Sequence, residues 1–125
     1  MTTATATVFS YRPSSEPDAR SAFRRAAPLM DPQYAQRAEP AATVLAPITG
    51  AMWARWASAG TTVTAVARVT ADDHPPDTGT RTARVLGVTQ TPSDHTPANR
   101  FAVYVEAERA NNVAGWRVSA LEVKQ

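Results

Sequence analysis

RFAVYVEAERANNVAGWRVSALEVKQ, residues 100–125, is the segment on which the fold depends most. In its first half, apolar residues alternate with small, polar and finally charged ones, which predicts a strand with one buried face. The apolar positions are Phe101, Val103, Val105 and Ala107. Asn111, Asn112 and Gly115 follow, and these residue types tolerate left-handed backbone angles in tight turns. The pattern therefore predicts two strands joined by a polar turn.

The second of these strands changes phase within its length. Its apolar residues occupy even positions at first and odd positions afterwards, namely Trp116 and Val118, then Leu121 and Val123. Because successive side chains point to opposite faces of a strand, a bulge near Ser119 and Ala120 is needed to turn both pairs inward. We expect residues 100–125 to form the central, most buried part of a curled sheet, with Trp116 anchoring the helices.

Two further strands are predicted upstream. Residues 62–71 have one apolar set, with Val66 as an exception: Val63, Ala65, Ala67 and Val69. Residues 80–91 are also β-rich, but their alternation is less regular, as expected of a central strand covered on both faces. The connections at 72–79 and 92–99 are predicted to be loops.

Helix signals come earlier in the chain. Ser15 and Asp18 form an S-x-x-D box, which predicts a helix that starts at Ser15 and ends before Pro28. Its buried stripe would consist of Ala19, Ala22, Phe23 and Ala26, and its solvent side of Arg20, Arg24 and Arg25. Asp31 followed by Pro32 predicts a second short helix.

The second helix is expected to run to about Ala38 and to be stopped by Pro40. Residues 41–51 show no clear period and are predicted to be an irregular connector. A helical turn or two is expected around Trp53 and Trp56, with Gly60 as its terminator. Residues 2–11 could be the end of a helix whose beginning is missing.

Helices followed by four strands with hairpin-like connections predict an α+β domain, in which helices pack on one face of an antiparallel sheet. At 125 residues, one domain covering 1–125 is expected. The predicted structural core contains Phe23, Trp53, Trp56, Val103, Val105, Trp116, Val118 and Leu121.

Composition excludes several kinds of site. The formal charge is +2, and the basic residues, nearly all arginines, are scattered among acidic ones, which does not form a nucleic-acid footprint. The sequence has no cysteine, so disulfides, thiolate nucleophiles and thiolate metal sites are impossible. It contains no run approaching the roughly 20 apolar residues of a membrane span, so the chain as given is expected to be soluble.

The densest polar cluster combines Asp72, Asp73, His74 and Asp77 with two prolines. Carboxylates and an imidazole could bind a hard or borderline cation such as magnesium or zinc. We favour a plain loop, because the prolines hold the segment extended and the aspartates cannot all converge. No metal or cofactor is therefore predicted.

Other polar and aromatic residues offer weaker signals of a site. His95 lies in a proline-containing loop without a recognisable nucleophile motif. Trp53, Trp56 and Trp116 could form a stacking platform for a base or a sugar, although filling the core is the favoured interpretation. Glu106 and Glu108 lie on the polar face of a strand and are expected to be solvated.

Several segments resemble the nuclear-transport-factor-2-like cone, and within it the extracytoplasmic domains of conjugation proteins of Gram-positive bacteria, relatives of the VirB-type assembly factor of type IV secretion. The resemblance extends over about residues 5–124. It rests on layout and on four segments: residues 26–34 (AAPLMDPQY), residues 53–56, the loop 72–78 (DDHPPDT) and the terminal GWRVS at 115–119.

The resemblance implies a non-enzymatic scaffold outside the cytoplasmic membrane, anchored by an N-terminal helix absent from this chain. Its partners would be other channel subunits and, weakly, further copies of itself, with no direct binding of nucleic acid. Two alternatives remain open: a small-ligand-binding or enzymatic cone, and an accessory domain of a lipid-import cluster. The apolar inward positions favour a filled cone over a catalytic one. We expect unpaired strand edges to mediate self-association.

Overall fold

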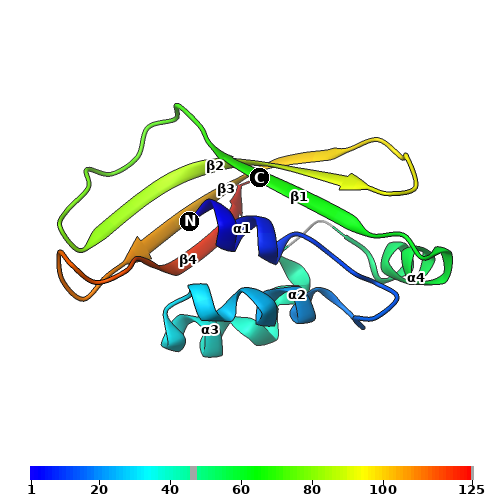
Figure 1. The fold of residues 1–125 in the computed structure, drawn as a ribbon. Helices are drawn as coiled ribbons and strands as arrows, with labels where there is room; N and C mark the ends of the chain where they lie inside the picture. The colour runs from blue at the N-terminus through cyan, green and yellow to red at the C-terminus, as the bar shows by residue number, and fades with distance from the viewer. Residues whose placement is uncertain (46–47, 125) are drawn as a thin grey trace.

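A computed structural model describes residues 1–45 and 48–124. Its elements in chain order are α1 (Thr2–Val8), α2 (Ala19–Ala26), the 3-10 helix η1 (Ala27–Leu29), α3 (Pro32–Ala38), the 3-10 helix η2 (Glu39–Val44), α4 (Gly50–Ala59), β1 (Val63–Val69), β2 (Arg81–Pro92), β3 (Asn99–Glu108) and β4 (Arg117–Lys124). The strands form one antiparallel sheet in the order β1-β2-β3-β4, and the helices lie on one side of it (Figure 1). The predicted α+β class is confirmed.

The first predicted helix starts later than expected. Asp18, in an extended conformation, is the N-cap of α2, and its Oδ1 accepts a hydrogen bond from the Arg20 N–H at 2.9 Å. Ser15 instead belongs to a turn, in which the amides of Ser15 and Glu16 donate to the carbonyl oxygen of Arg12. The start at Ser15 was wrong because Asp18 is itself a good cap and the upstream turn has already used the backbone groups of Ser15 and Glu16.

The cap at Asp31 is confirmed. Its Oδ2 accepts from the Tyr34 N–H at 3.0 Å, with Pro32 in the first turn of α3. Pro40 follows the end of α3, but the chain continues as the 3-10 helix η2. Proline is tolerated near the start of a helix, because the backbone N–H that it lacks would have no partner within the helix. The expected irregular connector at 41–51 is therefore wrong at both ends, and its residues 46 and 47 lie outside the described residues.

The fourth helix ends as predicted. Gly60 has φ of 69°, the left-handed conformation that glycine adopts without strain. The Thr61 amide donates to the Trp56 carbonyl oxygen at 2.9 Å, and β1 begins two residues later. This tight turn places α4 against the start of β1, at one end of the sheet (Figure 1).

The predicted bulge in β4 is confirmed. Glu106 pairs with Ala120 and Ala107 pairs with Val118, so Ser119 is the inserted residue. The expectation that both C-terminal strands are central was half wrong, since β3 is central and β4 is an edge strand. Strand β2 takes the other central place.

Both sheet edges are partly paired by the N-terminal third of the chain. At β1, the amide of Tyr11 donates to the Val63 carbonyl at 2.8 Å, and the Val63 amide donates back at 3.0 Å. At β4, the Asp31 amide donates to the Val118 carbonyl at 2.8 Å, and the Tyr34 hydroxyl accepts from the Leu121 N–H at 3.1 Å. These contacts reduce the open edge that was expected to mediate self-association.

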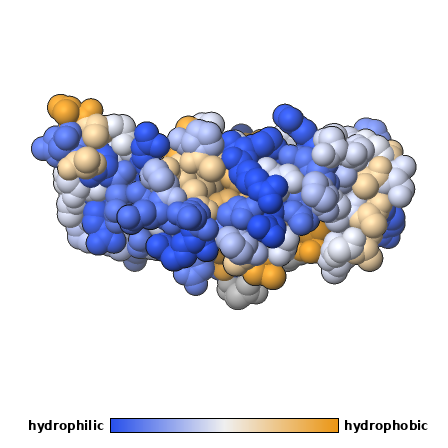
Figure 2. All heavy atoms as spheres, turned by 90° about the horizontal axis from the view of Figure 1, so that it is seen from below, coloured by the Kyte–Doolittle hydropathy of each residue, from blue (hydrophilic) through white to orange (hydrophobic). Residues whose placement is uncertain are grey.

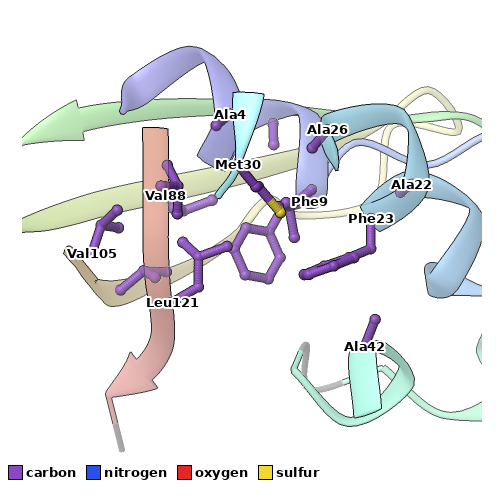
Figure 3. Packing of buried hydrophobic residues seen from close by; sticks show 14 of the residues in the cluster. Ala4, Phe9, Ala22, Phe23, Ala26, Met30, Ala42, Val88, Val105 and Leu121 are labelled. Carbon is purple, nitrogen blue, oxygen red and sulfur yellow. The ribbon is translucent and has the colours of Figure 1, made fainter. Parts of the chain in front are cut away.

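The core lies between the helices and the inward face of the sheet (Figure 3). Met30, Phe9 and Phe23 lie close together there, and Phe9 packs edge-on against Phe101 with ring centroids 5.0 Å apart. Of the eight residues expected in the core, six are buried: Phe23, Trp53, Val103, Val105, Val118 and Leu121. Trp56 is only partly buried at the margin of the core.

Trp116 is not a core residue. Its exposed fraction is 40%, and it precedes β4 rather than lying within it. Met30 of the neighbouring segment is fully buried beside the start of β4, where it forms a parallel bridge with Val118. The prediction that Trp116 is buried was therefore wrong, because the alternating strand begins only at Arg117.

Candidate interaction surface

The polar loop at 72–77 is used for an ion pair. Asp77 accepts hydrogen bonds from both terminal nitrogens of Arg84, each at 2.7 Å, and from the Thr82 hydroxyl at 2.8 Å. The Arg84 guanidinium holds the pKa of the Asp77 carboxyl well below its usual range. In the part of the chain that the structure describes, no three His, Cys, Asp or Glu side chains are grouped so that they could hold a metal ion.

His95 and the two strand glutamates do not converge on a site. His95 is exposed in the β2–β3 connection with φ of 66°. Its neighbour Asp94 accepts from the Thr96 hydroxyl at 2.6 Å and from the Thr96 N–H at 3.0 Å, which lowers the pKa of Asp94. Glu106 and Glu108 both lie within 4 Å of Arg81, at 3.7 and 3.5 Å.

The three tryptophans do not form one platform. Trp53 is buried, packs against Tyr11 at a centroid distance of 5.0 Å and donates its indole N–H to the Glu16 carbonyl at 2.9 Å. Trp56 lies on the same helix, α4, whereas Trp116 lies at the opposite end of the sheet, beside the β3–β4 connection (Figure 1). A shared stacking role for all three is therefore wrong.

Trp116 is held in a defined place at the surface. The side chain of Asn111 accepts from the amides of Val113 and Ala114 at 3.0 and 2.9 Å, which closes the β3–β4 turn. Arg109 lies over the indole, with its Cζ 4.2 Å from the ring centroid. Arg109 is fixed in turn, because its Nε donates to the Gly79 carbonyl at 2.7 Å. One face of the ring is thus covered by a guanidinium.

A recess opens beside Trp116. The apolar and small residues that line it come from η1, the start of α3 and the β3–β4 connection: Pro28, Leu29, Pro32, Ala110, Ala114 and Gly115. Leu29 is 42% exposed, similar to Trp116. Two large apolar side chains that could have been buried therefore share one open recess, which we call the Trp116 surface.

The acidic side chains of the Trp116 surface have partners, whereas its two arginines have no carboxylate partner among the described residues. Glu108 is paired with Arg81, and the Asp31 carboxylate accepts the Tyr34 N–H as a helix cap. Arg109 and Arg117 contact backbone carbonyls, those of Gly79 and Pro28, and neither has a carboxylate within 4 Å among the described residues. The surface therefore offers two guanidinium groups beside an exposed indole.

The helix side of the molecule looks different. Figure 2 shows this side as mostly hydrophilic, with apolar residues in small, separate areas. Part of that polarity comes from ion pairs, in which Glu39 accepts from both Arg20 and Arg24 at 2.8 and 2.7 Å. Such a surface is typical of one that remains in water.

The sequence contains a signal for the Trp116 surface, but the alternation of apolar residues in the predicted strand favoured a buried Trp116 instead. Trp116 follows Gly115 at the end of a turn rich in small and polar residues, and Arg109 precedes the same turn. An aromatic residue and an arginine at the two ends of a hairpin turn are brought side by side when the strands pair.

Comparison with models of known protein families, with curated proteins and with solved structures finds no match. Across residues 1–45 and 48–124, no helix has the length and the apolar character needed to cross a membrane.

Proposed function

We propose that this chain is a non-enzymatic assembly subunit that works through protein–protein contacts, and that the Trp116 surface is where a partner binds. The observation that carries the proposal is the exposed indole of Trp116, which stacks on Arg109 and adjoins Leu29. Tryptophan and arginine are the residues most enriched at the energetic centres of protein interfaces. Holding them rigid before binding lowers the entropic cost of association.

The finer fold proposed is a cystatin-like or nuclear-transport-factor-2-like cone that is filled by side chains. The bulge at Ser119 bends β4, and the helices that the structure describes lie on one side of the sheet (Figure 1). On that side Val103 and Val105 are fully buried, and Leu86 is as well. The interior is thus filled by side chains at the centre of the sheet, which favours a scaffold over an enzymatic member of the same cone.

The partner's chemistry follows from the charges. A segment with an apolar side chain to fill the recess and an acidic residue beside it would bury Leu29 and Trp116 and would pair with Arg109 or Arg117. Such pairs add specificity and speed association more than they add affinity. A second copy of this chain also fits the proposal, because weak self-association through the Trp116 surface needs no open strand edge.

The setting proposed for this activity follows the sequence resemblance: the extracytoplasmic side of a conjugative DNA-transfer channel. Two of the segments that carry the resemblance, residues 26–34 and 115–119, meet at the Trp116 surface. Their meeting supports a common role in contacts with channel subunits. A place in a lipid-import cluster would use the same surface on a different partner.

The proposal is tested by placing the photo-crosslinking amino acid p-benzoylphenylalanine at position 116 of the chain, expressed in the organism that encodes it. The expected result is one discrete adduct, in which mass spectrometry identifies a conjugation-channel subunit or a second copy of this chain. Val66 is the matched control, because it is 50% exposed but lies on β1, away from the recess.

Three results would overturn the proposal. The first is no adduct from position 116, and the second is the same set of adducts from positions 116 and 66. The third is an adduct in which the partner is a metabolic enzyme, which would remove the channel setting.

A further inference from the structure

A second recess lies at the end of the sheet opposite the Trp116 surface. It runs between α4 and the β2–β3 connection and has a volume of about 620 Å³. Its walls and floor include Met52, Trp56, Val63, Gln90, Pro92 and Asn99. We call it the α4 groove. Its volume lies within the range of sites that enclose small molecules, about 300–1,000 Å³.

The walls of the α4 groove are apolar and come from rigid elements. Met52 and Trp56 are one helical turn apart on α4, so their side chains lie on the same face of the helix. Val63 and Pro92 are Cα partners in the β1–β2 register and face them. A flat ring can lie against the half-buried indole of Trp56 between these walls.

The floor of the groove is polar but uncharged. Gln90 is 2% exposed and Thr61 is 3% exposed, and both line the groove. The Gln90 amide donates to the Phe9 carbonyl oxygen at 2.8 Å, and its own oxygen accepts from Asn99 at 3.3 Å. The Thr61 hydroxyl makes no hydrogen bond to any part of the chain that the structure describes. The Thr61 oxygen is not among the fully buried atoms that lack a partner, so it is open to a group that enters the groove.

The charged residues that line the α4 groove do not favour a charged ligand. Arg55 and Asp94 both line the groove and are of opposite sign. The buried polar side chains, Gln90 and Thr61, are uncharged at physiological pH, and so is the exposed Asn99 that donates to Gln90. A ligand that carries a net charge would therefore lose hydration without gaining a buried counter-charge.

We propose that the α4 groove binds a small, uncharged, amphipathic molecule with a planar apolar body that packs on Trp56 and a neutral hydrogen-bonding group, such as an amide, that meets Thr61 and Asn99. This site is independent of the Trp116 surface and of the assembly role. A ligand here would connect α4 with the β2–β3 connection at the far end of the molecule.

The test uses the ¹⁵N-labelled chain and 1-naphthamide, a planar two-ring amide, followed through the indole N–H signals of the three tryptophans. A saturable shift of the Trp56 signal is expected, with a Kd at or below about 1 mM, as suits a ligand of this size. The Trp116 signal should not move. 1-Naphthoate, which has the same rings and a negative charge, should bind at least about tenfold more weakly.

Two alanines of α4 provide a matched pair of variants. Ala59 lines the groove and Ala51 does not, while both are exposed on the same helix. Ala59→Phe should weaken 1-naphthamide binding at least about tenfold by filling the groove, and Ala51→Phe should leave it within about twofold. The proposal is overturned if the Trp56 signal shows no saturable shift, if Trp116 shifts with the same midpoint, or if the two variants bind alike.

Discussion

Replacing each of two tryptophans by alanine separates a core residue from a surface residue. Trp53→Ala removes a buried ring that packs on Tyr11 and a 2.9 Å hydrogen bond to the Glu16 carbonyl. Truncating a buried tryptophan costs about 3–5 kcal/mol of unfolding free energy. Trp116→Ala removes a 40% exposed ring and one cation–π contact. Exposed contacts of this kind are worth about 0.5–1 kcal/mol, and the covered part of the ring adds about 1 kcal/mol of apolar burial, so we expect a total cost of about 2 kcal/mol.

The two values come from urea unfolding followed by far-UV circular dichroism, with an unchanged slope as the sign that both variants unfold in the same manner. Trp53→Phe serves as an intermediate, because it keeps an aromatic ring but lacks the indole N–H, and should cost about 1–3 kcal/mol. A loss of more than about 3 kcal/mol in Trp116→Ala would place that residue in the core and refute the fold described above. Equal losses at the two positions would do the same.

Three further variants test local features. Gly60→Ala should destabilise the fold by about 1 kcal/mol, because φ is 69° at this position. Gly50→Ala is the control, since Gly50 is the first residue of the same helix and has free space around it. In the same urea titration this variant should be neutral or stabilising. Asp31→Ala should cost about 1 kcal/mol in thermal unfolding, since the variant loses the bond to the Tyr34 amide, and an unchanged melting temperature would contradict the cap. Hydrogen bonds from Arg20 lower the pKa of Glu39, so stability from this carboxylate is present at neutral pH and falls away below about pH 5. The difference in unfolding free energy between wild type and Glu39→Gln should therefore shrink from pH 7 to pH 3, and a constant difference would count against the ion pair.

The features that could be predicted from the sequence are those that local chemistry determines. Asp31 and Pro32 satisfy the first turn of a helix in any context, and Gly60 ends one because other residues resist its backbone angles. The bulge at Ser119 followed from the change of phase in the apolar positions alone. Each of these required no knowledge of distant segments.

The features that could not be predicted depend on contacts between distant segments. Trp116 continued an apolar pattern but is exposed, whereas Met30, 86 residues away in the sequence, is buried and forms a bridge with Val118. Strand β4 is an edge because the N-terminal third of the chain, and not another strand, pairs with it at Asp31. The recess beside Trp116 and the α4 groove likewise join segments that no local pattern connects.

We propose that the outward-facing Trp116 binds a partner in a DNA-transfer channel. This central claim is tested most directly by the frequency of conjugative DNA transfer from a donor strain in which the sole copy of the gene encodes Trp116→Ala, with Val66→Ala as the control. The expected result is a fall of at least about thirtyfold, the change in affinity that corresponds to an interface residue worth about 2 kcal/mol. The Trp116→Ala protein should be folded and present at its normal level, and the Val66→Ala strain should transfer normally. Transfer at the wild-type frequency from the Trp116→Ala strain would contradict it.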